Sequence, residues 1–144
     1  MTKIKFDNNF FSFISSIAVD AGLKILTEFK KKKQAHYKND GSPVTAADKI
    51  ANELIVKSLL EYSSEIPILS EESSPDSSFL DSDVLWAVDP LDGTKEFLSN
   101  SPDFTVNIAL IKNMYPIFGV VYAPMYDVLW AGYHDRIENT YSRS

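Results

Sequence analysis

Two stretches in the N-terminal half of the chain carry apolar residues at helical spacing. The first stripe consists of Phe10, Phe13, Ile14, Ile17, Ala18 and Ala21. It predicts a helix from about Asn9 to Lys31, capped by Asn8 or Asp7. The second stripe consists of Ile50, Leu54, Ile55, Leu59 and Leu60. It predicts a second long helix, from about Thr45 to Tyr62.

Short β-prone runs follow the two helical stretches. They are Ile66–Leu69, Val84–Val88, Phe104–Ile111, Ile117–Tyr122 and Val128–Tyr133. Val84–Val88 is apolar throughout, which is typical of a strand covered on both faces, and Pro90 is expected to end it because proline has no N–H to donate. The segment Ala123–Asp127 predicts a hairpin turn between the last two runs. Two long helices packed on a mostly antiparallel sheet give an α+β fold.

Composition narrows the classes of protein to consider. The chain has 144 residues, of which 44% are apolar, enough for one domain with a core. Its net charge of -6 argues against binding to a nucleic-acid polymer, since such polymers are held mainly by basic surface. The chain has no cysteine, in agreement with a cytoplasmic location. Polar residues interrupt the apolar run at 10–19, so neither a signal peptide nor a transmembrane segment is expected.

An acidic turn after the run Val84–Val88 carries the candidate chemistry. Asp89 and Asp92 lie three residues apart, with the Leu91 carbonyl between them. These groups can direct several oxygen atoms into one small volume. Mg²⁺ prefers all-oxygen ligands, and a chain with no Cys and only two His has little material for a zinc site. The turn therefore predicts a magnesium site, although acidic turns of this kind are also common on solvated surfaces.

The next two residues of the turn suggest a place for phosphate. Gly93 permits a tight reversal of the chain, and Thr94 can begin a short helix through Leu98. Amides at the start of a helix favour an anion. A phosphate held there, beside metal ions that activate a water molecule, predicts hydrolysis of a phosphate ester.

Two other segments supply further acidic residues. Glu71 and Glu72 follow the run Ile66–Leu69, and membership of a solvated loop is the alternative explanation for both. Asp48 lies three residues after Thr45, the spacing of a capping box, so helix capping alone would explain it. A position facing the metal ions is the second interpretation of Asp48.

Three motifs in this order resemble those of the inositol monophosphatase superfamily of Mg²⁺-dependent, lithium-sensitive phosphatases. They are Ser42-Pro43-Val44-Thr45-x-x-Asp48, Ser70-Glu71-Glu72 and Asp89-Pro90-Leu91-Asp92-Gly93-Thr94. Within this superfamily, Leu91 and the runs Thr94–Phe97 and Phe104–Ile111 are similar to the 3'(2'),5'-bisphosphate nucleotidases. The resemblance extends from Asn8 to about Trp130 and implies the N-terminal half of the sugar phosphatase fold.

The resemblance implies a role for each residue of these motifs. The implied ligands of two or more Mg²⁺ ions are Glu71, Asp89, the Leu91 carbonyl and Asp92. The resemblance also implies that Li⁺ inhibits the activity. The implied catalytic residues are Asp48, Thr94 and Glu71. Thr94 would hold the attacking water and Asp48 would take up its proton. The implied contacts to the substrate phosphate are Glu71, Leu91, Asp92, Gly93 and Thr94.

The implied substrate is a small phosphate ester, adenosine 3',5'-bisphosphate, a by-product of sulfate activation that would be cleaved at its 3'-phosphate to AMP. The superfamily also has a metal-binding Asp in a Trp-Asp-x-Ala-like motif, whereas Trp130-Ala131 is followed here by Gly132. We therefore expect an N-terminal metal- and phosphate-binding domain at 1–131, a polar, aberrant or disordered tail at 132–144, and no C-terminal domain. Two alternatives stay open: an inositol-1-monophosphatase, and a truncated, inactive remnant that binds Mg²⁺, phosphate or a partner without catalysis.

The run Lys30–Lys33 is the one basic run of the chain. We expect it to be a solvated helix end, where cations favour the helix dipole. The alternatives are attraction of phosphate together with Lys38, or contact with anionic lipid at the inner face of the cell membrane. Apolar surface left uncovered by the missing half would allow self-association.

Overall fold

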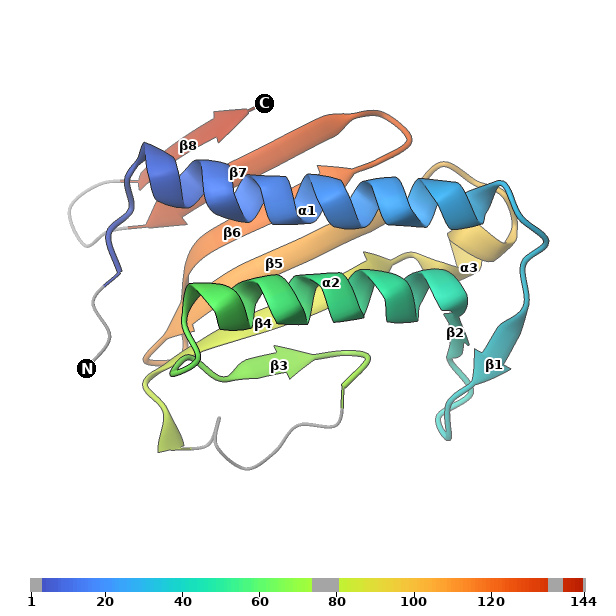
Figure 1. Cartoon of the computed structure of the whole chain (residues 1–144), viewed down its shortest axis with the longest axis horizontal. Coiled ribbons are helices and arrows are strands. Elements are labelled where there is room, and N and C mark those ends of the chain that lie inside the picture. The colour runs from blue at the N-terminus through green and yellow to red at the C-terminus, as the bar shows by residue number, and fades with distance from the viewer. Residues whose placement is uncertain (1–3, 74–80, 135–138, 144) are drawn as a thin grey trace.

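The computed structural model describes residues 4–73, 81–134 and 139–143. The helices α1 (Asn8–Phe29) and α2 (Ala46–Tyr62) lie side by side on one face of a six-stranded sheet (Figure 1). The short helix α3 (Thr94–Leu98) and a hairpin of β1 (Ala35–Tyr37) and β2 (Pro43–Thr45) lie near the N-terminal end of α2. The predicted α+β fold is confirmed.

The six strands of the sheet follow the order of the chain. They are β3 (Ile68–Ser70), β4 (Val84–Asp92), β5 (Thr105–Lys112), β6 (Tyr115–Ala123), β7 (Val128–His134) and β8 (Asn139–Arg143). β3 pairs with β4 in parallel, and every later pair is antiparallel. The carboxyl ends of β3 and β4 therefore meet at the same end of the sheet, where Glu71 follows β3 and Asp89 and Asp92 lie in the last residues of β4.

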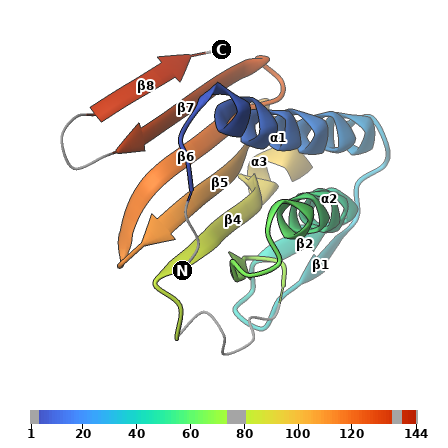
Figure 2. The same cartoon turned by 60° about the vertical axis from the view of Figure 1, so that its left-hand side comes forward.

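The core lies between the two helices and the sheet (Figure 2). Trp86 of β4 has no exposed surface, and its ring centroid lies 6.3 Å from that of Phe10 in α1. Each large apolar side chain buried in this way contributes roughly 1.5–3 kcal/mol to stability. On the opposite face of β4, Leu85, Ala87 and Asp89 are only half-buried. The expectation of a strand covered on both faces is wrong for the described chain, because the helices cover one face.

β4 does not end at Pro90, as the sequence predicts, but continues to Asp92. Its register against β5 shifts between Asp89 and Asp92. A strand irregularity of this kind releases residues from the hydrogen-bonded ladder, so a residue without an N–H can be accommodated. Leu91, 3% exposed, enters the core within the shifted segment.

The region predicted to be a polar tail is partly paired with the sheet. Residues 132–134 complete β7, and residues 139–143 form β8. The β7–β8 pairing runs from Trp130 opposite Arg143 to His134 opposite Asn139. An edge strand offers unpaired backbone groups to any extended segment, so this pairing does not require an apolar sequence. The domain boundary at residue 131 stays a prediction.

α1 is long and apolar enough by composition to cross a membrane, a test that the core helices of soluble proteins also pass. Its buried residues are Phe10, Ile14, Ile17, Ala18, Ala21, Gly22 and Ile25. This set includes most of the stripe read from the sequence, and it faces the sheet and α2. The helix therefore serves as a core element of this fold.

Candidate functional site

The turn after β4 depends on a glycine. Gly93 has a φ of +96°, in the left-handed region, and caps the N-terminus of α3. A Cβ at this position would lie only 2.8 Å from the carbonyl oxygen of Asp103. Glycine alone escapes both the backbone strain and the clash. It allows the chain to reverse so that Asp92 and Thr94 both face one cavity.

Asp48 and Thr94 are hydrogen-bonded although they lie far apart in the sequence. The Thr94 hydroxyl donates to Oδ1 of Asp48 at 2.9 Å. Oδ2 of Asp48 accepts from the N–H and the hydroxyl of Thr45 at 2.8 and 2.6 Å. The predicted capping box is present, and the same carboxylate is the partner of Thr94. Asp48, 1% exposed, therefore lies behind Thr94 and is held from both sides.

Glu71 lies beside Asp89 because β3 and β4 are parallel. Ser70 is opposite Val88 in the register, and the N–H of Glu71 donates to the Val88 carbonyl at 3.1 Å. Glu71 and Asp89 each follow one member of this pair. The carboxylate-bearing residue of the second acidic segment is thereby placed next to the acidic residues of β4.

A surface cavity of about 240 Å³ brings most of the predicted site residues together. Those that line it are Glu71, Asp89, Leu91, Asp92, Gly93 and Thr94. Asp48 does not line the cavity and reaches it only through Thr94. The structure thus assembles the predicted set, while the individual roles in metal and substrate binding stay predictions.

Asp89 has a raised pKa among the carboxylates of the cavity. Burial, and then the negative charges of Asp92 and Glu71, raise the pKa of Asp89 from 3.8 to about 6. A bound cation would offset this repulsion. Among the described residues, no three Asp, Glu, His or Cys side chains are arranged to hold an ion. The all-oxygen donor set nevertheless fits Mg²⁺ in its chemistry.

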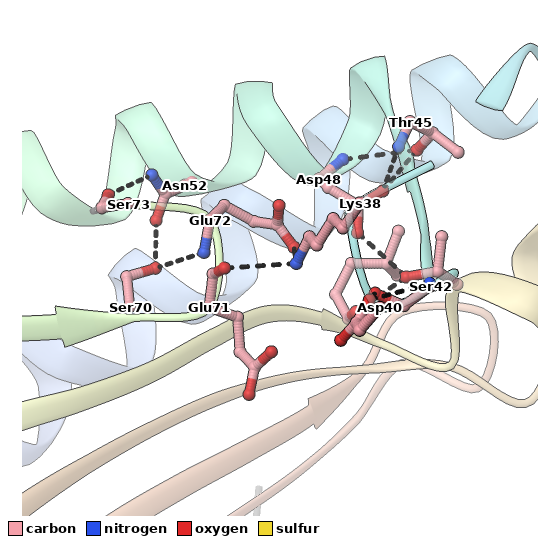
Figure 3. A network of polar contacts seen from close by, with 12 residues as sticks. Lys38, Asp40, Ser42, Thr45, Asp48, Asn52, Ser70, Glu71, Glu72 and Ser73 are labelled. Atoms are coloured by element: carbon pink, nitrogen blue, oxygen red, sulfur yellow. Dashed lines mark hydrogen bonds and ion pairs between the residues drawn. The ribbon is translucent and has the colours of Figure 1, made fainter. Parts of the chain in front are cut away.

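Lys38 brings a positive charge to the edge of the same cavity. The β1–β2 turn positions it, since the Lys38 N–H donates to the Ser42 carbonyl at 2.8 Å. Its ammonium group contacts the Glu72 carboxylate at 3.0 Å and the Glu71 carbonyl at 3.2 Å (Figure 3). Burial lowers the pKa of Lys38, but the bond to Glu72 and the charges of Glu72, Glu71 and Asp48 outweigh burial and raise it.

Comparison with known proteins gives a consistent result. Residues 7–140 match the inositol monophosphatase family. The chain belongs to this family. The family resemblance read from the three motifs is confirmed.

The relatives of this chain include proteins called 3'(2'),5'-bisphosphate nucleotidase CysQ. That of Buchnera aphidicola is 44% identical over 125 residues, which cover 85% of this chain and 47% of that protein. The CysQ protein of Escherichia coli strain K12 is 48% identical over 95 residues, which cover 65% of this chain and 39% of that protein. The chain spans about half the length of the curated relatives it matches, or less.

Solved structures with a similar fold include a member of the inositol monophosphatase family. CysQ from Bacteroides thetaiotaomicron, described as a bacterial member of the family, is 36% identical with a TM-score of 0.75. Its match covers 96% of this chain and 51% of that one. The extragenic suppressor protein suhB from Bartonella henselae is 28% identical with a TM-score of 0.83, over 95% of this chain and 52% of that one.

Sequence reasoning missed one polar residue that lies next to the family motifs. Asn52 of α2 is 8% exposed and hydrogen-bonds to Ser70 and Ser73. Its spacing of four residues from Asp48 places both on one face of the helix, otherwise lined with apolar residues. A polar side chain on that face was the available signal.

We predict that Asp89→Asn stabilises the metal-free chain at neutral pH. Because the pKa of Asp89 is raised by folding to about 6, the folded form binds the proton more tightly than the unfolded form. The free energy of unfolding therefore falls as the pH rises from about 4 to about 6. After allowance for solvent screening, the free energy of unfolding of the variant should exceed that of wild type by about 1 kcal/mol above this pH range. Below this pH range the two proteins should be equally stable.

Urea unfolding of both proteins at several pH values, in a chelator, measures this difference. A gain of equal size at every pH would contradict the assignment to Asp89 ionisation. Added Mg²⁺ should reverse the order of stability, since the wild-type carboxylate then gains a ligand role that the amide lacks.

Proposed function

We propose that this chain forms the metal-binding half of a Mg²⁺-dependent phosphatase that removes the 3'-phosphate of adenosine 3',5'-bisphosphate. The observation that carries the proposal is the Thr94–Asp48 hydrogen bond of 2.9 Å beside the cavity of carboxylates. This arrangement gives a water molecule a hydroxyl to bind and a carboxylate to receive its proton. The CysQ relatives favour the nucleotide as substrate.

Thr94 and Asp48 would orient the attacking water and accept its proton. The Thr94 hydroxyl has one proton, which it donates to Asp48 at 2.9 Å in preference to the Leu91 carbonyl at 3.3 Å. Its lone pairs are then free to accept a hydrogen bond from water, and a proton can pass through the hydroxyl to Asp48. The two Thr45 donors stabilise the Asp48 carboxylate in this orientation.

Glu71, Asp89, Asp92 and the Leu91 carbonyl would hold the metal. Their oxygen atoms fit a hard divalent cation, and the exposed Asp92 can move towards the other two carboxylates. When bound, Mg²⁺ would lower the pKa of a coordinated water and offset the charge of the phosphate. The chain spans about half the length of the relatives it matches.

A non-catalytic binding role is the second candidate function. The face of the sheet away from the helices bears a groove of about 560 Å³, lined mainly by small and apolar side chains of β4, β5 and β6. About half of the length of these relatives lies outside the part that matches this chain. On this account the chain would bind Mg²⁺, phosphate or a partner, or self-associate, without turnover. A cytoplasmic location, with which the lack of cysteine agrees, suits both candidates.

Phosphate release separates the candidate functions. Purified chain is incubated with adenosine 3',5'-bisphosphate or inositol 1-phosphate and Mg²⁺, with and without Li⁺, and Asp92→Asn serves as the blank. We expect Mg²⁺-dependent, Li⁺-sensitive release that is faster from the nucleotide. Faster release from inositol 1-phosphate would favour the inositol monophosphatase alternative, and no release above the blank would favour the non-catalytic role.

A further inference from the structure

A buried polar network joins α2 to the residues that follow β3. Asn52 accepts a hydrogen bond from the Ser70 hydroxyl at 2.5 Å and donates to the Ser73 hydroxyl at 2.9 Å. Both bonds come from one side-chain amide, so Asn52 fixes the two ends of the segment 70–73. Asn52 is 8% exposed and Ser70 is 5% exposed, which shields these bonds from water.

The network continues into the backbone around Glu71. The Ser70 hydroxyl accepts the N–H of Glu72 at 3.4 Å, and Lys38 contacts the Glu71 carbonyl and the Glu72 carboxylate. The Glu71 side chain points away from α2, on the opposite side of the segment from Asn52 (Figure 3). Asn52 thus holds the segment 70–73 on the side of α2, and the Glu71 carboxylate on the other side can face Asp89.

We propose that Asn52 is a positioning residue for the metal site, holding the Glu71 carboxylate where it can share a cation with Asp89. The inference rests on the proposed function and extends it to a residue outside the three motifs. Asn52 lies one helical turn after Asp48, so one face of α2 orients both the proton acceptor and the acidic segment. Substitution of a residue that orients a metal ligand typically lowers metal affinity by about 10–100-fold.

The alternative is that Asn52 only stabilises the fold. An amide with two buried hydrogen bonds contributes to stability whatever its function. A control substitution must therefore lower stability without altering a contact to the segment 70–73. Ile55, completely buried on the same helix, meets this condition, because its side chain belongs to the core cluster.

The test compares Mg²⁺ binding by wild type, Asn52→Ala, Ser73→Ala and Ile55→Val, each as the whole chain, by isothermal titration. We expect Asn52→Ala to weaken Mg²⁺ binding about tenfold, a ratio typical of residues that orient ligands. Ser73→Ala loses only one of the two bonds and should weaken it less. Ile55→Val should lower the unfolding temperature and leave the Mg²⁺ affinity unchanged.

Hydrogen exchange of the metal-free proteins gives a second readout that needs no metal. Exchange of the Glu71 and Glu72 amides should speed up in Asn52→Ala and not in Ile55→Val. Absence of Mg²⁺ binding by wild type would overturn the proposed function, and unchanged exchange would overturn the positioning role independently. Equal Mg²⁺ affinity of wild type and Asn52→Ala would leave Asn52 a structural residue and contradict the inference.

Discussion

Asp48→Asn should lower the Mg²⁺-dependent release of phosphate by about 10²–10⁴-fold, the usual contribution of a general acid or base. The amide cannot take up the proton that Thr94 passes on, although it retains one oxygen that can accept from the Thr94 hydroxyl. Mg²⁺ affinity should change little, because Asp48 does not line the cavity. Initial rates with adenosine 3',5'-bisphosphate measure the first effect and isothermal titration measures the second.

Thr45→Ala is the matched control for Asp48→Asn. This substitution removes the Thr45 hydroxyl, which caps the helix and donates a hydrogen bond to Oδ2 of Asp48. The hydrogen bond from Thr94 to Oδ1 of Asp48 is retained. We expect a loss of about 1 kcal/mol in stability from the missing cap, with a much smaller loss of rate. If both variants lost equal rates, Asp48 would matter for the helix N-terminus rather than for proton transfer.

Gly93→Ala should be the most disruptive single change at the turn. Alanine would have to adopt a φ of +96° and place its Cβ 2.8 Å from the Asp103 carbonyl oxygen. The backbone conformation and the overpacking together cost on the order of 3 kcal/mol. Because Asp92 and Thr94 flank this position, phosphate release should also fall well below that of wild type. Urea unfolding measures the loss of stability.

Gly41→Ala separates the two contributions. Gly41, in the β1–β2 turn, has a φ of +86°, but a Cβ there would meet nothing within 4 Å. We expect a loss of roughly 1–2 kcal/mol from the left-handed backbone alone. Equal losses at Gly41 and Gly93 would show that the close approach of Asp103 contributes nothing.

The residues of the site could be predicted because their chemistry is local. Asp89, Asp92 and Gly93 lie close together in the sequence, and the capping spacing of Thr45 and Asp48 is a pattern within one helical turn. Each pattern predicts a structure before any long-range contact is known. The Asp48–Thr94 bond was implied by the family resemblance and is present at 2.9 Å.

Three features of the strands could not be predicted in the same way. The β1–β2 hairpin has three residues in each strand, too few to show a periodic pattern. The continuation of β4 past Pro90 depends on a register shift against β5. Pairing of β8 with β7 depends on an available strand edge. These features are set by partners distant in sequence.

Asn52 shows the same limit within the site. Its type and position suggest only a polar residue on a helix. Its two serine partners lie on a segment about 20 residues away, and β3 brings that segment under α2 by pairing with β4. The function of such a residue depends on tertiary contacts, so a motif search does not find it.

We propose that the acidic residues Asp89 and Asp92, at the carboxyl end of β4, bind Mg²⁺. Calorimetric titration of the metal-free chain with Mg²⁺, beside Asp92→Asn, tests it most directly. We predict saturable binding to wild type and at least tenfold weaker binding to the variant, on the order expected for loss of a ligand or its partner. Equal binding by the two proteins, or no saturable binding by wild type, would contradict the claim.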